Sequence, residues 1–133
     1  MIVDCQESVV ARPCMIVVDE KPSPAALLAR AFRRHGWDVY HARSGAEARR
    51  LARMLEPELL VMATDLAEES GWLTCEKLTR EQPGVKVFLV GDAADSHNHD
   101  FAAFVGAVRL LNERDSVQDL VEEVCGRTLP VAG

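Results

Sequence analysis

Short apolar segments alternate with amphipathic helical segments along this chain, and the alternation limits the folds that the chain can adopt. Residues 14–18 and 59–63 are continuously apolar, as strands buried on both faces of a sheet are. Shorter patterns predict three further strands at residues 37–42, 85–90 and 107–111. Strands that alternate with helices are joined by right-handed crossovers. The sequence therefore predicts an α/β domain, with a parallel sheet and helices on both of its faces.

Capping residues and apolar periodicity predict five helices. Ser23 and Pro24 indicate the start of the first helix, with the Ser23 hydroxyl as N-cap, and Gly36 indicates its end. Ser44 and Glu47 have the spacing of a capping box at the start of the second helix. The remaining helices are expected to open at Ser70-Gly71 and to occupy residues 101–104 and 115–125, with residues 91–99 as a polar loop.

Length and composition are those of one globular domain. The 133 residues are 48% hydrophobic and 27% charged, which is enough apolar material for one buried core. The regular pattern begins at Cys14, after Pro13, so residues 1–13 are expected to form an N-terminal extension. Residues 14–126 are expected to form the domain and residues 127–133 a C-terminal tail.

The charge balance argues against nucleic acid as a partner. Asp and Glu outnumber Lys and Arg by 21 to 15, and a net charge of −6 disfavours nucleic-acid binding by this domain alone. Two arginine clusters, within residues 30–34 and 49–53, have helical spacing. We interpret both clusters as solvated helix faces.

Cysteines and apolar runs indicate the compartment. Cys5, Cys14, Cys75 and Cys125 are scattered and form no Cys-x-x-Cys pair. No apolar run approaches the roughly 20 residues that a membrane-spanning helix needs, and the first residues lack the pattern of a secretory signal. We therefore expect a reduced cytoplasmic domain that does not contact a membrane.

Acidic residues follow the first predicted strand, where a site is expected. In parallel sheets of this kind, ligands bind beyond the carboxyl ends of the strands. Asp19 and Glu20 are adjacent carboxylates at such an end, and they suit a hard divalent cation such as Mg²⁺. The residues alone leave open the alternative of a solvated acidic loop.

Several segments, in their order and spacing, carry a resemblance to a known family. They are residues 16–22, 27–28, 35–37, 44–48, 57–62, 70–72, 83–90 and 106–107. Together they resemble a bacterial two-component response-regulator receiver domain, of the CheY-like kind, over about residues 14–126. The resemblance implies a flavodoxin-like three-layer sandwich, in which a five-stranded parallel sheet has the order 2-1-3-4-5.

In that family, a histidine kinase phosphorylates an aspartate at the end of the third strand, and the acid pair after the first strand holds Mg²⁺. A Thr or Ser after the fourth strand and a Lys after the fifth contact the phosphoryl group. The gap-free correspondence over residues 57–71 places Ala63 at the phosphoacceptor position. The other switch positions fall on Gly91 for the hydroxyl, with Asp92 next to it, on Glu113 for the Lys and on Leu110 for the aromatic residue that moves on activation.

These departures change the function that the resemblance implies. Alanine has no nucleophile, so we expect a pseudo-receiver: a signalling domain of a two-component or phosphorelay system that acts as a phosphorylation-independent protein-interaction module and not as an enzyme. No cofactor would be required. Mg²⁺ would bind only weakly at Asp19 and Glu20, because the acidic pocket that these two form with Asp92 lacks the carboxylate of the phosphoacceptor.

The resemblance also implies partners. They would be a histidine kinase, an output domain, another regulator or a second copy of the chain. In the family, the face formed by the fourth helix, fifth strand and fifth helix carries such contacts. Here that face would include Phe101, Phe104, Arg109, Leu110, Arg114 and Val117. Most of its apolar residues are expected to be core, so Arg109 and Arg114 are the better candidates for exposed contacts.

Two alternatives concern other residues. Thr64-Asp65-Leu66 resembles the triplet around the family's phosphoacceptor, so Asp65 would be the acceptor if two residues were missing before Ser70. His97 and His99 form a His-x-His pair, which can chelate zinc when it lies on a strand. A metal-binding module is therefore the remote alternative.

Overall fold

One parallel sheet organises residues 12–128, the part of the chain that the computed structural model describes. Its strand order is β2-β1-β3-β4-β5, and every neighbouring pair is parallel. The elements of this part are β1 (Cys14–Val18), α2 (Pro22–Arg34), β2 (Asp38–Ala42), α3 (Gly45–Leu55), β3 (Leu59–Ala63), α4 (Gly71–Glu81), β4 (Lys86–Gly91), α5 (Ser96–Phe104), β5 (Arg109–Asn112) and α6 (Val117–Thr128). The predicted α/β fold and strand order are confirmed.

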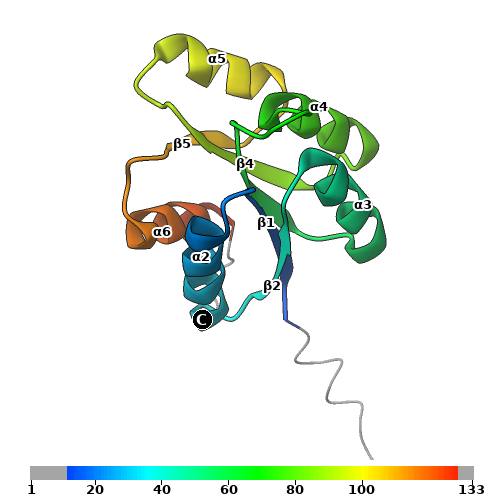
Figure 1. Cartoon of the computed structure of the whole chain (residues 1–133), viewed down its shortest axis with the longest axis vertical. Helices are drawn as coiled ribbons and strands as arrows, with labels where there is room; N and C mark the ends of the chain where they lie inside the picture. Colours follow the sequence, from blue (N-terminus) through cyan, green and yellow to red (C-terminus); the bar gives the residue numbers. More distant parts are fainter. Residues whose placement is uncertain (1–11, 129–133) are drawn as a thin grey trace, which may run out of the picture.

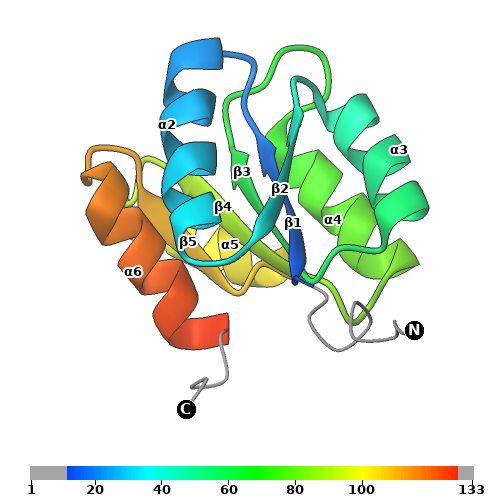
Figure 2. The same cartoon turned by 90° about the horizontal axis from the view of Figure 1, so that it is seen from below.

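The helices cover both faces of the sheet, as Figures 1 and 2 show. α2 and α6 lie on one face, where Phe32 and Val124 pack in one core cluster with Val17 of β1. α3, α4 and α5 lie on the other face, where Ala52 joins a second cluster with Ile16. Successive strand residues point to opposite faces. A continuously apolar strand such as β1 therefore fills both cores at once.

The carboxyl ends of the strands meet along one edge of the sheet. Val18 of β1 lies beside Met62 of β3, and Ala63 of β3 lies beside Val90 of β4. The ladder therefore brings together the residues that follow β1, β3, β4 and β5. This edge is the place where the sequence predicts a site.

The helix starts agree with the sequence prediction in one case and differ in another. Ser44 caps α3 as predicted: its Oγ accepts the N–H of Glu47 at 3.1 Å, and Glu47 Oε1 accepts the N–H of Arg43 at 2.7 Å. The prediction that Ser23 caps the first helix is wrong, because α2 begins at Pro22. The fixed φ of a proline in the first turn starts the helix without a side-chain cap.

α5 is the largest difference from the sequence prediction. Residues 96–99, predicted as part of a polar loop, form its first turn, and Asp95 Oδ1 caps that turn by accepting the N–H of His97 at 2.9 Å. Ala102 is the buried residue of this helix, whereas Ser96 to Phe101 are exposed or half-buried. A helix that buries so little apolar surface carries no apolar periodicity, so its pattern could not be recognised.

One backbone contact and one helix reach slightly past the residues predicted for the domain, 14–126. Pro13, assigned to the extension, accepts the N–H of Asp38 through its carbonyl, and α6 continues past residue 126 to Thr128. The rest of the predicted extension, with Cys5, and residues 129–133 of the predicted tail lie outside the described residues. Within the described range, every helix is too short or too polar to cross a membrane.

Candidate functional site

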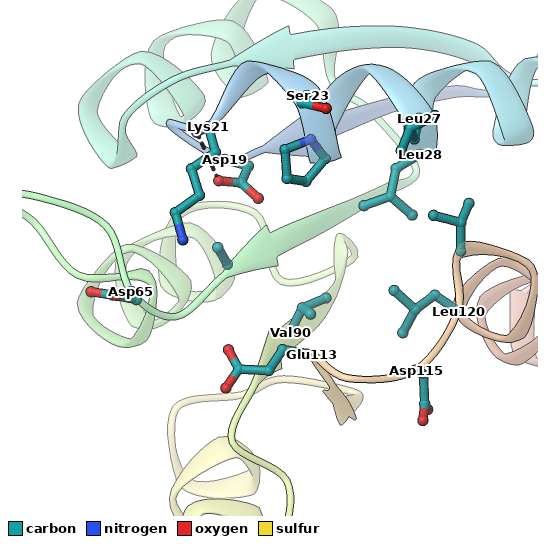
Figure 3. Close-up of a pocket in the computed structure, with 13 residues that line it drawn as sticks. Asp19, Lys21, Ser23, Leu27, Leu28, Asp65, Val90, Glu113, Asp115 and Leu120 are labelled. Atoms are coloured by element: carbon teal, nitrogen blue, oxygen red, sulfur yellow. Dashed lines mark hydrogen bonds between the residues drawn. The ribbon is translucent and has the colours of Figure 1, made fainter.

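A pocket of about 370 Å³ lies at the carboxyl edge of the sheet, between α2 and the loop that leads into α6 (Figure 3). Leu28 and Leu120, both buried, form its apolar floor with Val90. Carboxylates line the rim, among them Asp19 and Glu113. The other lining residues are Lys21, Ser23, Pro24, Leu27, Ala63, Asp65, Asp115 and Val117.

Ala63 occupies the end of β3 and lines this pocket half-buried. The strand end is held in register, because the N–H of Thr64 donates to the carbonyl of Val90 at 3.0 Å. The backbone of Ala63 is also covered closely: a Cβ added to Gly71 would collide with the carbonyl oxygen of Ala63. The position that corresponds to the phosphoacceptor therefore lies in the pocket, and a methyl group points from it.

The two acids that follow β1 do not converge. Asp19 Oδ1 accepts the N–H of Lys21 at 2.9 Å, in the turn that leads into α2. Glu20 turns toward the loop after β3, where its Oε1 accepts the N–H of Ala67 at 3.1 Å. Asp19 lines the pocket, whereas Glu20 does not. Each carboxylate is engaged with backbone, so the predicted acid pair is separated.

This arrangement does not fit the divalent cation that the family implies. A hard cation needs several oxygen ligands directed at one point. Asp19 and Glu20 are directed to different amides, and Ala63 supplies no carboxylate. Over residues 12–128, no group of three or more His, Cys, Asp or Glu residues is placed to hold a metal ion.

Asp65, the alternative acceptor, is exposed on the loop after β3 and lines the same pocket. Figure 3 shows its carboxylate directed away from the pocket interior, with the ammonium of Lys21 on the side toward the pocket. The sequence interpretation gave Lys21 no role at the site. Its position directly after an acid pair at a strand end was the signal that it would reach the site.

Thr64 explains why a glycine stands at the position of the family's hydroxyl residue. A Cβ added to Gly91, at the end of β4, would collide with Oγ1 of Thr64 and crowd its methyl group. The side chain that follows β3 therefore fills the space that a side chain on β4 would need. The sequence interpretation identified Gly91 as a loss and missed this compensation.

Asp92 belongs to a different depression from Asp19. With Asn112, Glu113 and Arg114 it lines a neighbouring surface pocket, and its Oδ1 accepts the N–H of Ala94 at 3.1 Å. The three acids that were predicted to form one acidic pocket, Asp19, Glu20 and Asp92, therefore do not line the same depression. Glu113 is the acid that lines both depressions.

The predicted partner face is exposed only in part. Leu110 has 3% of its surface exposed and lies in the core beneath α5, so it cannot contribute to a partner contact. Arg109 is exposed and pairs with Glu123 at 3.0 Å, and Arg114 is exposed in the loop after β5. The expectation that most apolar residues of this face are core does not hold for Phe101 and Phe104.

Both phenylalanines lie on the surface of α5, and Phe104 is 81% exposed. Phe101 packs against Trp72 of α4, with ring centroids 5.0 Å apart, and against Phe104 at 6.1 Å. Val117, which was also assigned to the face, lines the pocket of Figure 3 instead.

His97 and His99 lie on α5 and not on a strand. Residues two apart on a helix do not share a face. His97 Nδ1 lies 3.5 Å from Asp95 Oδ1, whereas His99 Nε2 lies 2.7 Å from the carbonyl oxygen of Ala93. The geometry therefore does not support the predicted zinc pair.

Glu69 anchors the loop that carries Asp65, and the sequence interpretation missed it. Its carboxylate accepts two hydrogen bonds from the Arg49 guanidinium, at 2.9 and 3.0 Å, one from the Thr74 hydroxyl at 2.6 Å and one from Lys77 at 3.1 Å. Chiefly through the Arg49 bonds, this network lowers the pKa of Glu69 to about 2. Arg49, interpreted as part of a solvated helix face, is therefore a structural cation.

The chain matches the family model for the response regulator receiver domain over residues 15–124. Among curated relatives, it is 34% identical over 76 residues to the probable transcriptional regulatory protein TcrX of Mycobacterium tuberculosis. It is 27% identical over 70 residues to RpaA, the DNA-binding dual master transcriptional regulator of a Synechocystis species. These matches cover 57% and 53% of this chain but 32% and 29% of the relatives, so the matched part spans about a third of their length.

Solved receiver structures share the fold. A two-component response regulator of the LuxR family from an Aurantimonas species superimposes with a TM-score of 0.80 at 20% identity, over 87% of this chain and 84% of that one. Chemotaxis protein CheY4 of Vibrio cholerae also gives 0.80, at 15% identity, over 86% and 97%.

A response regulator from Burkholderia pseudomallei, solved with a phosphorylated aspartic acid, a calcium ion and citrate, gives 0.75 at 24% identity, over 83% and 65%. At these identities the structural likeness shows the fold alone. The family match rests on the sequence of residues 15–124, and the chain belongs to the response regulator receiver domains of two-component signalling systems.

Proposed function

We propose that this receiver domain acts as a protein-interaction module without a phosphorylation cycle of its own. The observation that carries the proposal is Ala63 at the end of β3, where a methyl group faces the pocket. An aspartyl phosphate requires a carboxylate nucleophile at that point. Because alanine supplies none, signalling would depend on surface contacts, and the domain would catalyse no reaction.

The charges around the pocket support this proposal. A phosphoryl group adds about −1.5 to −2 charges. Here it would lie near Asp19, Glu113 and Asp115, which line the same pocket. A lysine is the family's residue at the position of Glu113, so the charge that would stabilise the phosphoryl group is reversed.

Phosphorylation of Asp65 is the second candidate, and its place in the lining of the pocket favours it. Two contacts count against it, because Glu20 binds the amide of Ala67 and Glu69 binds Arg49. They hold the part of the loop that follows the exposed Asp65. Rearranging this loop around a phosphoryl group would cost the hydrogen bonds that now fix it.

Acetyl phosphate and beryllofluoride with Mg²⁺ would test the two candidates on wild-type protein and the Asp65→Asn variant. We expect no phosphoryl adduct by intact mass, and no reagent-dependent amide shifts along β3, β4 and β5, in either protein. An adduct on wild type that is absent from Asp65→Asn would replace the proposal by phosphorylation of Asp65. A phosphorylatable receiver treated in parallel would verify the reagents.

We propose a protein of the same signalling system in the cytoplasm as the partner. It would be a histidine kinase, an output domain, another regulator or a second copy of this chain. Arg109, the first residue of β5, and Arg114, in the loop after β5, are exposed and are the residues that we assign to this contact. DNA binding, the activity that the name of RpaA states, would require a separate output domain, because this chain carries a net charge of −6.

A further inference from the structure

The pocket of Figure 3 extends well beyond the end of β3. Leu27 and Leu28 of α2 face Leu120 of α6 across it. The volume of about 370 Å³ falls within the range of small-molecule sites, which are concave and mostly apolar with a few polar groups. A receiver domain that binds no phosphoryl group here would therefore have a cavity of a size that suits a small molecule.

The polar groups of this pocket are mainly acids. Asp19, Asp65, Glu113 and Asp115 line it, against the single cation Lys21. Within residues 12–128, the side chains of Asp65, Glu113 and Asp115 make no hydrogen bond or ion pair. Acids gathered at the mouth of a low-dielectric cavity attract cations and repel anions.

We propose that this pocket binds a small organic cation with an apolar body, such as an aromatic or aliphatic primary amine. The apolar part would lie against Leu27, Leu28 and Leu120, and the ammonium would lie at the rim near Glu113 and Asp115. A bare metal ion fits less well, because the described acids are not grouped for one. The inference rests on the proposed function in one respect, since a phosphoryl group at this edge would compete for the same space.

Amide-shift titrations can test this inference with small probes of matched shape. Phenethylamine and hexylamine supply the cation, phenethyl alcohol is the neutral counterpart, and 3-phenylpropionate is the anionic one. We expect saturable shifts with the amines at Lys21, Leu27, Val117 and Leu120, weaker shifts with the alcohol, and none there with the carboxylate. Added salt should weaken amine binding, because the acids are exposed.

Substitutions of exposed lining residues should change affinity in opposite directions. Glu113→Gln and Asp115→Asn each remove an acid and should weaken amine binding about 2- to 5-fold. Lys21→Gln removes the competing cation and should tighten binding by a similar factor. Leu27→Ala should weaken the amines and the alcohol alike. Asp100→Asn, the same charge change on α5 and outside the pocket, is the matched control and should have no effect.

Three outcomes would overturn the inference. They are the absence of saturable shifts with either amine, equal binding of the alcohol and the amines, and unchanged amine affinity in both Glu113→Gln and Asp115→Asn. Binding of an arginine-bearing peptide in place of the amines would also overturn it, in favour of a protein partner. A phosphoryl adduct formed from acetyl phosphate on this domain would contradict the proposed function. Amine binding would then be judged by these titrations alone.

Discussion

At the scale of single residues, Thr64 and Gly91 are packed against each other at the ends of β3 and β4. The side chain of Thr64 occupies the space next to Gly91, where the family has its own hydroxyl residue. Reversal of one position would therefore not restore the family's arrangement. The residues at positions 64 and 91 are sterically coupled, so they have to be tested as a pair.

A double-mutant cycle on Thr64 and Gly91 measures this coupling. Gly91→Thr should destabilise the domain by about 1–3 kcal/mol, because its Cβ would collide with Thr64 in a closely packed region. Thr64→Ala combined with Gly91→Thr should recover more than half of that loss, since the alanine vacates the space. Urea unfolding of the four proteins gives the coupling free energy. Strict additivity of the two changes would contradict the steric explanation.

At the scale of elements, neighbouring helices begin by different means. α3 begins with a capping box at Ser44, whereas α2 begins at Pro22 after a turn held by Asp19. α5 begins at Ser96 with Asp95 as its N-cap, in a stretch without apolar periodicity. Caps act locally and can be recognised from short patterns, but a serine near a helix start is not a cap unless its hydroxyl reaches a free amide.

Substitution of the two serines tests this difference. Ser44→Ala should lower the free energy of unfolding by about 0.5–2 kcal/mol, because the N–H of Glu47 loses its acceptor. Ser23→Ala is the matched control and should change it by less than about 0.5 kcal/mol, because Ser23 is exposed and α2 has no side-chain cap. Chemical denaturation measures both values. A larger loss in Ser23→Ala would show that α2 depends on Ser23 after all.

At the scale of the whole molecule, the Glu69 network joins parts that are far apart in the sequence. Arg49 comes from α3, Thr74 and Lys77 come from α4, and Glu69 lies in the loop between β3 and α4. The pKa of Glu69 is lowered from 4.5 to about 2 in the folded protein. A lowered folded pKa gives stability that is present above the unfolded pKa and lost as the pH falls toward the folded value.

Stability should therefore decline between about pH 4.5 and pH 2 partly through Glu69. Glu69→Gln should cost about 1–3 kcal/mol at neutral pH, because Arg49 and Lys77 lose a charged acceptor. Between about pH 4.5 and pH 2, the free energy of unfolding of this variant should also fall less than that of the wild type, because glutamine does not titrate. Urea unfolding at several pH values measures both effects.

Glu81→Gln is the matched control for this prediction. Glu81 also pairs with an arginine of α3, Arg53, but at 3.4 Å and with both side chains about half exposed. An exposed pair contributes about 0–1 kcal/mol, so this variant should keep nearly the full wild-type decline in acid. Equal pH profiles for Glu69→Gln and wild type would refute the role given to Glu69.

The sequence by itself determined the elements that local pattern encodes. Continuous apolar runs gave β1 and β3, and Ser44 with Glu47 gave the start of α3. The alternation of elements and the family resemblance then led to the strand order. The position of Ala63 also needed no structure, because the apolar run of residues 59–63 ends there. The family resemblance over residues 57–71 then assigned it to the phosphoacceptor position.

Only the tertiary structure decided how side chains distant in the sequence meet. Glu20 is directed away from Asp19, because its carboxylate accepts a hydrogen bond from the N–H of Ala67. Thr64 lies against Gly91. The tertiary structure also set an apolar floor from α2 and α6 beneath an acidic rim. These contacts depend on the direction of each side chain after packing, and local patterns in one sequence do not carry that information.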